Sequence, residues 1–383
     1  MRVTSDFECG NGKNIVEIAP GHFRIEEEGE KSPYCKYFCV RVDGGAEGGI
    51  AELSIYPDPL LGDAGRIGFM GHYPSKLWFS ESEMTFWQPV TNRWPNADVF
   101  GDDHICTRVA VPAGEHVYVA SNLVWPYSQL QQWSEAMVAK GAESFPMGMS
   151  FEGRPIPRLH LPAGDADPLR VMVLSGQHPS EHCATLGAAG IVEFLLSQHP
   201  EAQAMRRGCD VWAMPMINVD GNVHGRNGWT MQDVNPCEDF SGAVEGVVPK
   251  AEEDRQLWRW LTEEFRPDII FHFHGYLGTR GCADAPYDGM YIFNDAAAVY
   301  RKPEDLARYR LATDLLFWDT AGLSASTTLP EHQESHLETQ LALACGTTSV
   351  FYEINHGFAG VAASKQRGAH VFRSVMRALL ALG

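Results

Sequence analysis

A histidine and a glutamate three residues apart, His178 and Glu181, follow the apolar run Val171–Leu174. This run ends in Ser175-Gly176 and is typical of a buried strand, and an amphipathic segment begins near Glu181. A side chain at a strand exit and one in the first helical turn can reach the same point, and zinc accepts nitrogen and oxygen ligands at about 2.0–2.2 Å. On spacing alone, a capping carboxylate beside a loop histidine explains the pair better than a metal site does.

Two further histidines, His272 and His274, close the segment DIIFHFH. Side chains alternate along a strand, so both histidines lie on the same face of it. His274 stands at the strand's end, directly before Gly275. A pair of histidines at a strand exit indicates metal ligands as readily as it indicates buried structural histidines.

A glutamate, Glu353, closes the β-branched and aromatic segment TTSVFYE. An isolated buried charge is costly, so a carboxylate at the end of a buried strand needs a partner or a function. Ligands of open α/β sheets bind beyond the carboxyl ends of the strands. His178, His274 and Glu353 all follow or end predicted strands, and we expect them to share one site.

A rival pair of histidines occurs in EHQESH, where His332 and His336 are four residues apart and could lie on one helix face. A zincin has glutamate directly after its first histidine, and Gln333 stands there instead. A solvated helix start is therefore the favoured interpretation, although these histidines could line a cleft. His182 and His356 flank the site motifs, and a supporting role for either stays open.

The N-terminal third of the chain consists of short alternating runs separated by turn signals such as Asp43-Gly44-Gly45. This pattern predicts an antiparallel β-sandwich domain over residues 1–124, with a packing or accessory role. Its expected strands are Asn14–Ile18, His22–Glu26, Tyr34–Val42, Gly49–Ile55, Cys106–Val111 and His116–Ala120.

Strands and helices alternate over residues 125–383, which predicts an α/β domain with a mixed, mostly parallel sheet flanked by helices. The expected strands are Arg158–Leu161, Val171–Leu174, Asp210–Met216, Asp268–His274 and Thr347–Glu353. A first helical stretch is expected to open at Pro126-Tyr127-Ser128 and to run through Leu130, Trp133, Met137 and Val138. The other expected helices cover residues 181–198, 252–264, 304–318, 336–344 and 364–381.

Composition narrows the classes of partner. The 383 residues include 44% hydrophobic and 21% charged residues, which is ordinary for a soluble globular protein. A formal net charge of −19 argues against nucleic acid or an anionic membrane as a partner. The N-terminal residues have no apolar core typical of a signal peptide, and no run is long enough for a membrane span. Nine scattered cysteines are expected to be reduced, so we expect a cytoplasmic protein. Its oligomeric state is left open.

The ordered segments GQHPSE, INVDGN, GRN with QDVN, FHFHG and VFYE resemble the M14 family of zinc carboxypeptidases, in its cytosolic carboxypeptidase-like branch. That branch carries a β-sandwich ahead of the catalytic domain, joined by a Pro-Tyr-Thr/Ser segment like Pro126-Tyr127-Ser128 here. The segment GMSFEGRPI is similar to the family's Gly-x-Ser-x-x-Gly-Arg. The resemblance covers roughly residues 115–360 and implies an α/β zinc carboxypeptidase-like fold.

The resemblance also implies roles for individual residues. One Zn²⁺ per chain would be held by His178, Glu181 and His274, which leaves a fourth position for water. Glu353 matches the general base of the family. The remaining matches are Asp233, a carboxylate that fixes the tautomer of the first histidine, Arg226, which stabilises the oxyanion, and Asn235, which grips the substrate's terminal carboxylate.

Two positions depart from the family pattern. His272 stands where the family usually has aspartate, and Pro236 replaces the arginine expected after Asn235. Proline has neither charge nor donor, so it cannot bind a carboxylate through two parallel bonds as arginine does. Another arginine, such as Arg280 or Arg255, could reach the site from elsewhere in the chain.

Three functions therefore stand. The first is a zinc metallocarboxypeptidase that cleaves a peptide or amide bond with a zinc-activated water and releases a C-terminal residue. The second is a zinc amidase or deacylase that acts on a small amide without a free α-carboxylate. The third is a catalytically silent binding protein, against which the three matched ligands and Glu353 argue.

Overall fold

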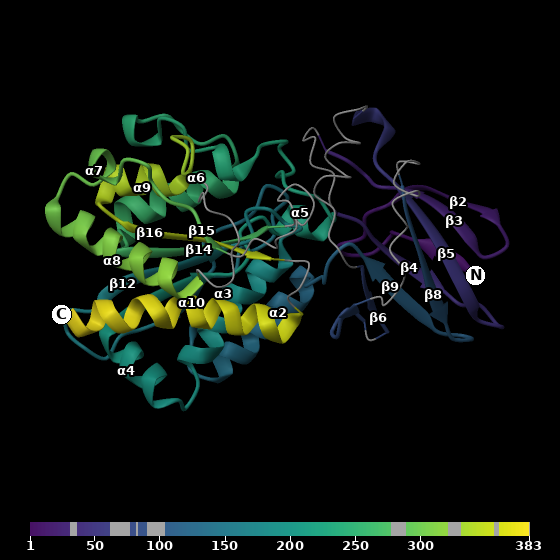
Figure 1. Ribbon diagram of the computed structural model, residues 1–383, viewed down its shortest axis with the longest axis horizontal. Coiled ribbons are helices and arrows are strands. Elements are labelled where there is room, and N and C mark those ends of the chain that lie inside the picture. Colours follow the sequence, from purple (N-terminus) through teal and green to yellow (C-terminus); the bar gives the residue numbers. More distant parts are fainter. Residues whose placement is uncertain are drawn as a thin grey trace.

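The computed structural model describes residues 1–30, 37–61, 77–81, 83–89, 104–276, 289–320, 331–355 and 360–382. Two parts lie side by side, an N-terminal pair of sheets and a larger α/β part (Figure 1). The N-terminus lies in the first part, and the C-terminus lies at the opposite end of the molecule.

The N-terminal part is a β-sandwich, as predicted. One sheet has the order β1 (Arg2–Thr4), β4 (Cys39–Asp43), β9 (His116–Ala120), β6 (Trp78–Ser80), β7 (Gln88–Pro89). The other has the order β2 (Lys13–Ala19), β3 (His22–Glu26), β5 (Gly49–Tyr56), β8 (Ile105–Val111). Alternate side chains of both sheets, including Val40, Leu53 and Val117, form one buried core. The described pairings are antiparallel except that of β3 with β5, which is parallel.

The α/β part is built on a seven-stranded sheet whose four central strands are parallel and whose flanking strands pair antiparallel. Its order is β10 (Glu143–Ser144), β11 (Leu159–Leu161), β13 (Cys209–Met214), β12 (Leu169–Ser175), β14 (Ile269–Tyr276), β16 (Thr348–Asn355), β15 (Gly289–Met290). The central strands are buried on both faces, which explains their apolar runs. The predicted mixed, mostly parallel sheet is confirmed.

Helices cover both faces of this sheet (Figure 1). Phe271 of β14 packs on Phe372 of α10 (Val361–Leu382), with ring centroids 5.0 Å apart, on the face that α3 (His182–Leu195) and α8 (Pro303–Thr320) also cover. A Cβ on Gly368 would lie 2.0 Å from the Gly187 carbonyl oxygen, so α3 and α10 approach each other closely through glycine.

The other face packs against α6 (Glu252–Arg259), the π-helical turn Trp260–Phe265 and α9 (Leu337–Cys345). Ile270 of β14 joins Leu337 and Leu341 in this second cluster. Because neighbours along a strand alternate between faces, His272 and His274 point to the α9 side with Ile270.

The remaining helices are short or lie beside the sheet. They are η1 (Pro59–Leu61), α2 (Tyr127–Ala139), α4 (Pro200–Gly208), α5 (Val219–Val223), η3 (Pro236–Glu238), η4 (Ala243–Glu245) and α7 (Ala296–Val299). The sequence did not predict α4 or α5. The proposed domain boundary at 124/125 falls between β9 and α2 and stays a prediction.

Two expectations about the whole chain concern reduced cysteines and membrane spans, and both can be compared with the structure only over the described residues. Seven cysteines lie there, and all of them are free thiols. None of the described helices combines the length and apolar character that crossing a membrane requires. The N-terminal portion of the expected strand Tyr34–Val42 lies outside the described residues.

Candidate metal centre

Three side chains converge at one edge of the central sheet. His178 Nδ1 lies 2.9 Å from Glu181 Oε1, and His274 Nδ1 lies 3.0 Å from Glu181 Oε2. One ligand atom from each of the three residues lies within 4.8 Å of the other two. A single ion placed between them could therefore contact two imidazole nitrogens and a carboxylate oxygen.

Neighbouring parallel strands place these three residues. Strand β12 ends at Ser175, and Gly176 turns the chain with a φ of +72°, where a Cβ would lie 2.7 Å from the Met216 Cα. The turn leads to His178, and Glu181 is the N-cap residue of α3. His274 lies near the end of β14, which pairs with β12 in parallel, so both carboxyl ends meet at one edge. The Gly275 N–H donates to Glu181 Oε2 at 2.9 Å and fixes the carboxylate.

The nitrogens that face away from the cluster also have partners. His178 Nε2 lies 3.1 Å from Asn235 Oδ1, and His274 Nε2 lies 3.3 Å from Gln177 Oε1 and 3.1 Å from His272 Nε2. A histidine that gives its Nδ1 lone pair to a metal carries its proton on Nε2 and needs an acceptor there. The Gln177 amide itself donates to the Pro236 carbonyl at 3.0 Å. Asn235 and Pro236 thus help to hold the two histidines in place.

A buried relay continues from His274 to a second carboxylate. If His274 carries its proton on Nε2, it donates a hydrogen bond to His272 Nε2. His272 then carries its own proton on Nδ1, and this nitrogen closely contacts Glu338 Oε1. Burial raises the pKa of Glu338, but the opposing effects of His272, His332 and His336 outweigh it and hold the pKa at about 2. Burial, with His272 nearby, lowers the pKa of His274 to about 3, so His274 is a neutral imidazole, which is the form that can bind a metal.

Glu353 lies directly beside this cluster. Strands β14 and β16 pair in parallel with His274 opposite Glu353, and paired residues project to the same face of a sheet. The Phe351 ring, two residues before Glu353, stacks on His274 with centroids 4.5 Å apart and planes 18° apart. The Glu353 side chain is buried at 7% exposure. A carboxylate in this position can exchange protons with a molecule held at the cluster.

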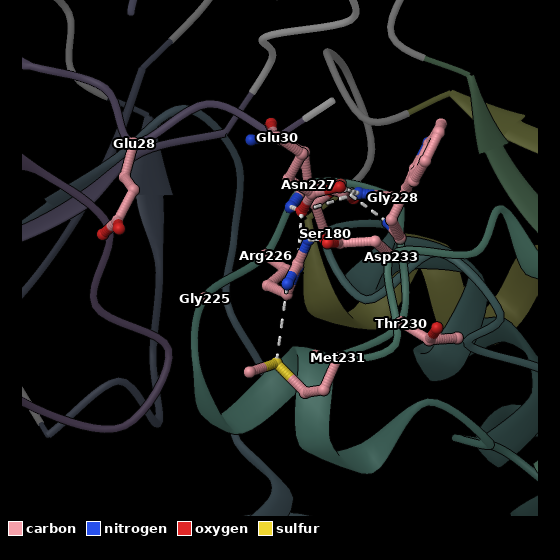
Figure 2. A network of polar contacts seen from close by, with 12 residues as sticks. Glu28, Glu30, Ser180, Gly225, Arg226, Asn227, Gly228, Thr230, Met231 and Asp233 are labelled. Carbon is pink, nitrogen blue, oxygen red and sulfur yellow. Dashed lines mark hydrogen bonds and ion pairs between the residues drawn. The ribbon is translucent and has the colours of Figure 1, made fainter. Parts of the chain in front are cut away.

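Arg226 and Asp233 form a different group, between the two parts of the molecule (Figure 2). Arg226 Nη2 donates to Asp233 Oδ1 at 2.8 Å, and Arg226 Nε lies 3.4 Å from Glu30 Oε1. Arg226 Nη1 also contacts the Met231 sulfur at 3.8 Å. Glu30 accepts the backbone N–H groups of Asn227, Gly228 and Trp229. Asn235 lies beside His178, and the role expected for Asp233 at that histidine stays a prediction.

A cavity of about 520 Å³ opens at this junction. Its polar lining includes Asn11, Glu28, Glu30, Asp58, His224, Arg226 and Asp233, so carboxylates predominate there. The GMSFEGR segment is held in place by Asp220, which accepts hydrogen bonds from Ser150 Oγ at 2.7 Å and from Arg154 Nη1 at 2.6 Å. Asp220 therefore anchors this loop to α5.

The interpretation of His332 and His336 as a solvated helix start is wrong. The His332 side chain is fully buried and His336 is 6% exposed, just ahead of α9. The tertiary fold lays this segment against β16, which the sequence spacing does not reveal. His182 is buried too, and its Nδ1 accepts the Trp125 N–H at 3.2 Å. His356 and Arg280 lie outside the described residues, and Arg255 pairs with Glu252 on α6.

Sequence reasoning missed three residues around the centre: Gln177, Glu338 and Cys237. Glu338 lies in the first turn of α9, where acidic residues are common, so the sequence carried no signal that marked it as part of the centre. Cys237 follows Pro236, and burial together with Glu338, Glu181 and Glu353 raises the pKa of its thiol. These three glutamates come from three separate segments, so no local pattern could identify Cys237.

Comparison with known proteins finds a family match for part of this chain. Residues 130–249 match the family model for zinc carboxypeptidases, and this span includes His178 and Glu181. The chain is 27% identical over 108 residues to cytosolic carboxypeptidase 1 of Danio rerio, and 26% identical over 100 residues to cytosolic carboxypeptidase 4 of Mus musculus. These matches cover 28% and 26% of this chain but 9% of each relative.

Solved structures extend the likeness to the whole chain. A metallo-carboxypeptidase from Burkholderia cenocepacia superposes with a TM-score of 0.80 at 16% identity, covering 100% of both chains. A metallo-carboxypeptidase from Pseudomonas aeruginosa, in complex with (2-guanidinoethylmercapto)succinic acid, has a TM-score of 0.78 at 17% identity and covers 99% of both chains. The zinc carboxypeptidase-like α/β fold with additional antiparallel sheets in its N-terminal region is therefore shown.

Proposed function

We propose that this protein is a zinc-dependent hydrolase of the metallocarboxypeptidase type, which cleaves a peptide or amide bond. One observation carries the proposal: Glu353 lies opposite His274 on the neighbouring parallel strand, next to the His178–Glu181–His274 cluster. The family match of residues 130–249 supports it. The free cysteines of the described part and the names of the cytosolic relatives support a cytoplasmic location.

The donor set fits a catalytic zinc. Two imidazole nitrogens and one carboxylate oxygen are a known ligand set for a site that keeps its fourth position open. Zinc bound there would polarise the scissile carbonyl and make a water more acidic. The Asn235 oxygen and the Gln177 oxygen hold the two histidines with Nδ1 toward the ion, and His272 assists at His274.

Glu353 is the proposed proton carrier. Its carboxylate takes a proton from the attacking water and returns it to the leaving nitrogen, so that one group serves both halves of the reaction. An oxyanion role for Arg226 would require the guanidinium to leave Asp233 and Glu30, which it contacts in this structure. We therefore assign proton transfer to Glu353 and leave Arg226 as a conditional oxyanion donor.

The substrate end of the site favours a second candidate, a zinc amidase or deacylase acting on a small amide. Pro236 occupies the position where an arginine is expected and contributes a carbonyl to Gln177. Asn235 is the residue expected to bind the substrate's terminal carboxylate. Its side-chain oxygen instead contacts His178 and also accepts the Cys237 N–H at 3.3 Å. Because a carboxylate is best bound by a bidentate arginine, this arrangement predicts weak binding of a free C-terminus.

One comparison separates the two candidates. The same peptide is offered with a free and with an amidated C-terminus, alongside a small N-acyl amide, and release of the amine is measured at matched zinc. A rate that strongly favours the free acid establishes a plain carboxypeptidase. Comparable or higher rates for the blocked peptide or the amide support the amidase. Absence of turnover with zinc bound would support a silent binding protein.

A further inference from the structure

A second group of potential metal ligands lies behind the first. His332, His336 and Glu338 each offer a ligand atom, and these atoms lie within 4.8 Å of one another. His332 and His336 come from the segment ahead of α9, and Glu338 comes from the first turn of that helix. All three side chains are buried, with exposures of 0%, 6% and 1%. The zinc carboxypeptidase match ends at residue 249 and does not include them.

The two buried nitrogens of the His332 ring are the observation that calls for a bound ion. Both of its nitrogens are buried, and neither has a hydrogen-bond partner among the described residues. Buried polar nitrogens are normally paired, because leaving one unpaired costs the desolvation energy of the group. The ring is walled by Phe293 and Phe351, with centroids 4.5 and 5.5 Å away, and these side chains offer no acceptor. The Tyr291 ring lies further off, at 5.9 Å.

The Glu338 carboxylate supplies a negative charge for a cation at this group. One oxygen contacts His272 Nδ1, and the other, Oε2, lies 4.0 Å from His332 Nδ1. That separation is too long for a hydrogen bond and leaves room for a bridging atom. His336 Nδ1 accepts a long bond from the Gln333 N–H at 3.3 Å, and an ion at this nitrogen would replace that bond.

We propose that His332, His336 and Glu338 bind a second divalent transition-metal ion. Two imidazoles and a carboxylate suit zinc best among common ions, and a buried ion would give one His332 nitrogen a partner and contact the second Glu338 oxygen. The two sites are joined by a continuous chain, because Glu338 also contacts His272, and His272 contacts the proposed zinc ligand His274. The second ion does not depend on the proposed hydrolase activity.

Metal stoichiometry tests the proposal without any substrate. The chain is stripped with chelator, reloaded in buffered zinc, desalted and analysed by plasma emission spectrometry. Four proteins are compared: wild type, His178→Ala, the double variant His332→Ala/His336→Ala, and His370→Ala. His370 is an exposed histidine on α10 and controls for the loss of an imidazole. Circular dichroism and thermal unfolding establish that each variant is folded.

We expect two zinc ions per chain in wild type and His370→Ala, and one in each of the other two variants. One ion in wild type that His178→Ala loses and the double variant keeps would overturn the proposal. So would two ions in a folded double variant. If the double variant does not fold, His332→Gln replaces it, and it should lower the affinity for the second equivalent.

A spectroscopic readout assigns the ion to these side chains. Cobalt(II) loaded into His178→Ala should give the visible d–d bands of a nitrogen- and oxygen-ligated ion, since only the second site remains intact. Adding His332→Gln to that background should remove the bands. Bands that survive would place the cobalt elsewhere and overturn the assignment, whereas failure of the hydrolase proposal would leave this result unchanged.

Discussion

His274 and Glu353 occupy opposite positions on the parallel strands β14 and β16. Adjacent strands lie about 4.8 Å apart, and both side chains project to the face that α9 covers. The distance between the proposed ligand and the proposed base is therefore set by a hydrogen-bonded ladder in the middle of the sheet. A site held by such a ladder is more rigid than one built from loops.

The first prediction concerns Glu353. Glu353→Gln keeps the shape of the side chain but cannot accept the proton, so turnover should fall by about 10²–10⁴-fold or more while zinc content stays unchanged. Steady-state rates on the best substrate of the peptide and amide panel, together with metal analysis, measure both effects. Near-full activity in a zinc-loaded Glu353→Gln protein would move the base to another residue.

The second prediction concerns the ligand set. His274→Ala removes one of three proposed ligands, and zinc strongly prefers at least three protein ligands, so this variant should lose one equivalent of zinc together with its activity. His199→Ala, which removes an exposed histidine at the start of α4, should keep both. A His274→Ala protein that retains wild-type zinc and activity would exclude His274 as a ligand.

The third prediction concerns the relay behind His274. His272→Ala removes the acceptor at His274 Nε2 and leaves Glu338 without its proton donor, so the first site should bind zinc about 10–100-fold more weakly. Zinc affinity is measured by competition with a chromophoric chelator.

A rescue distinguishes this positioning role from general damage to the core. The combination His272→Asp/Glu338→Gln restores an acceptor for His274 without placing two carboxylates together, and it should recover part of the affinity. Equal affinity in wild type and a folded His272→Ala would show that the relay does not influence the metal.

The fourth prediction concerns stability at acid pH. Glu201 on α4 accepts from Arg377 and from Arg373 of α10, the latter at 2.6 Å. These bonds, that of Arg377 above all, lower the pKa of Glu201 from 4.5 to about 2. The folded-state pKa lies below the unfolded one, so this stabilisation is fully present above pH 4.5 and is lost as pH falls toward 2.

Glu201→Gln should therefore lower the free energy of unfolding by about 0.5–1 kcal/mol at pH 6, and the difference from wild type should shrink at pH 3. Urea unfolding at the two pH values measures it, and effects of acid on the metal sites cancel in the difference. Glu263→Gln, an exposed carboxylate outside this network, controls for the loss of a charge. A difference that stays constant with pH would contradict the assignment.

The sequence by itself determined the strands and the residues at their ends. Period-two alternation placed His272 and His274 on one face, and the rule that sites lie beyond the carboxyl ends of strands grouped His178, His274 and Glu353. Both inferences depend on local pattern, which short-range sterics and burial enforce. The structure brings these residues together at neighbouring parallel strands.

Tertiary structure decided which groups stand behind them. His178 meets Asn235, His272 meets Glu338 across 66 residues of sequence, and Arg226 pairs with Glu30 from the N-terminal sandwich. The histidines of EHQESH became a buried group because the segment ahead of α9 packs against β16. These contacts join segments far apart in the chain, and their geometry depends on how helices and sheets pack, which no local periodicity encodes.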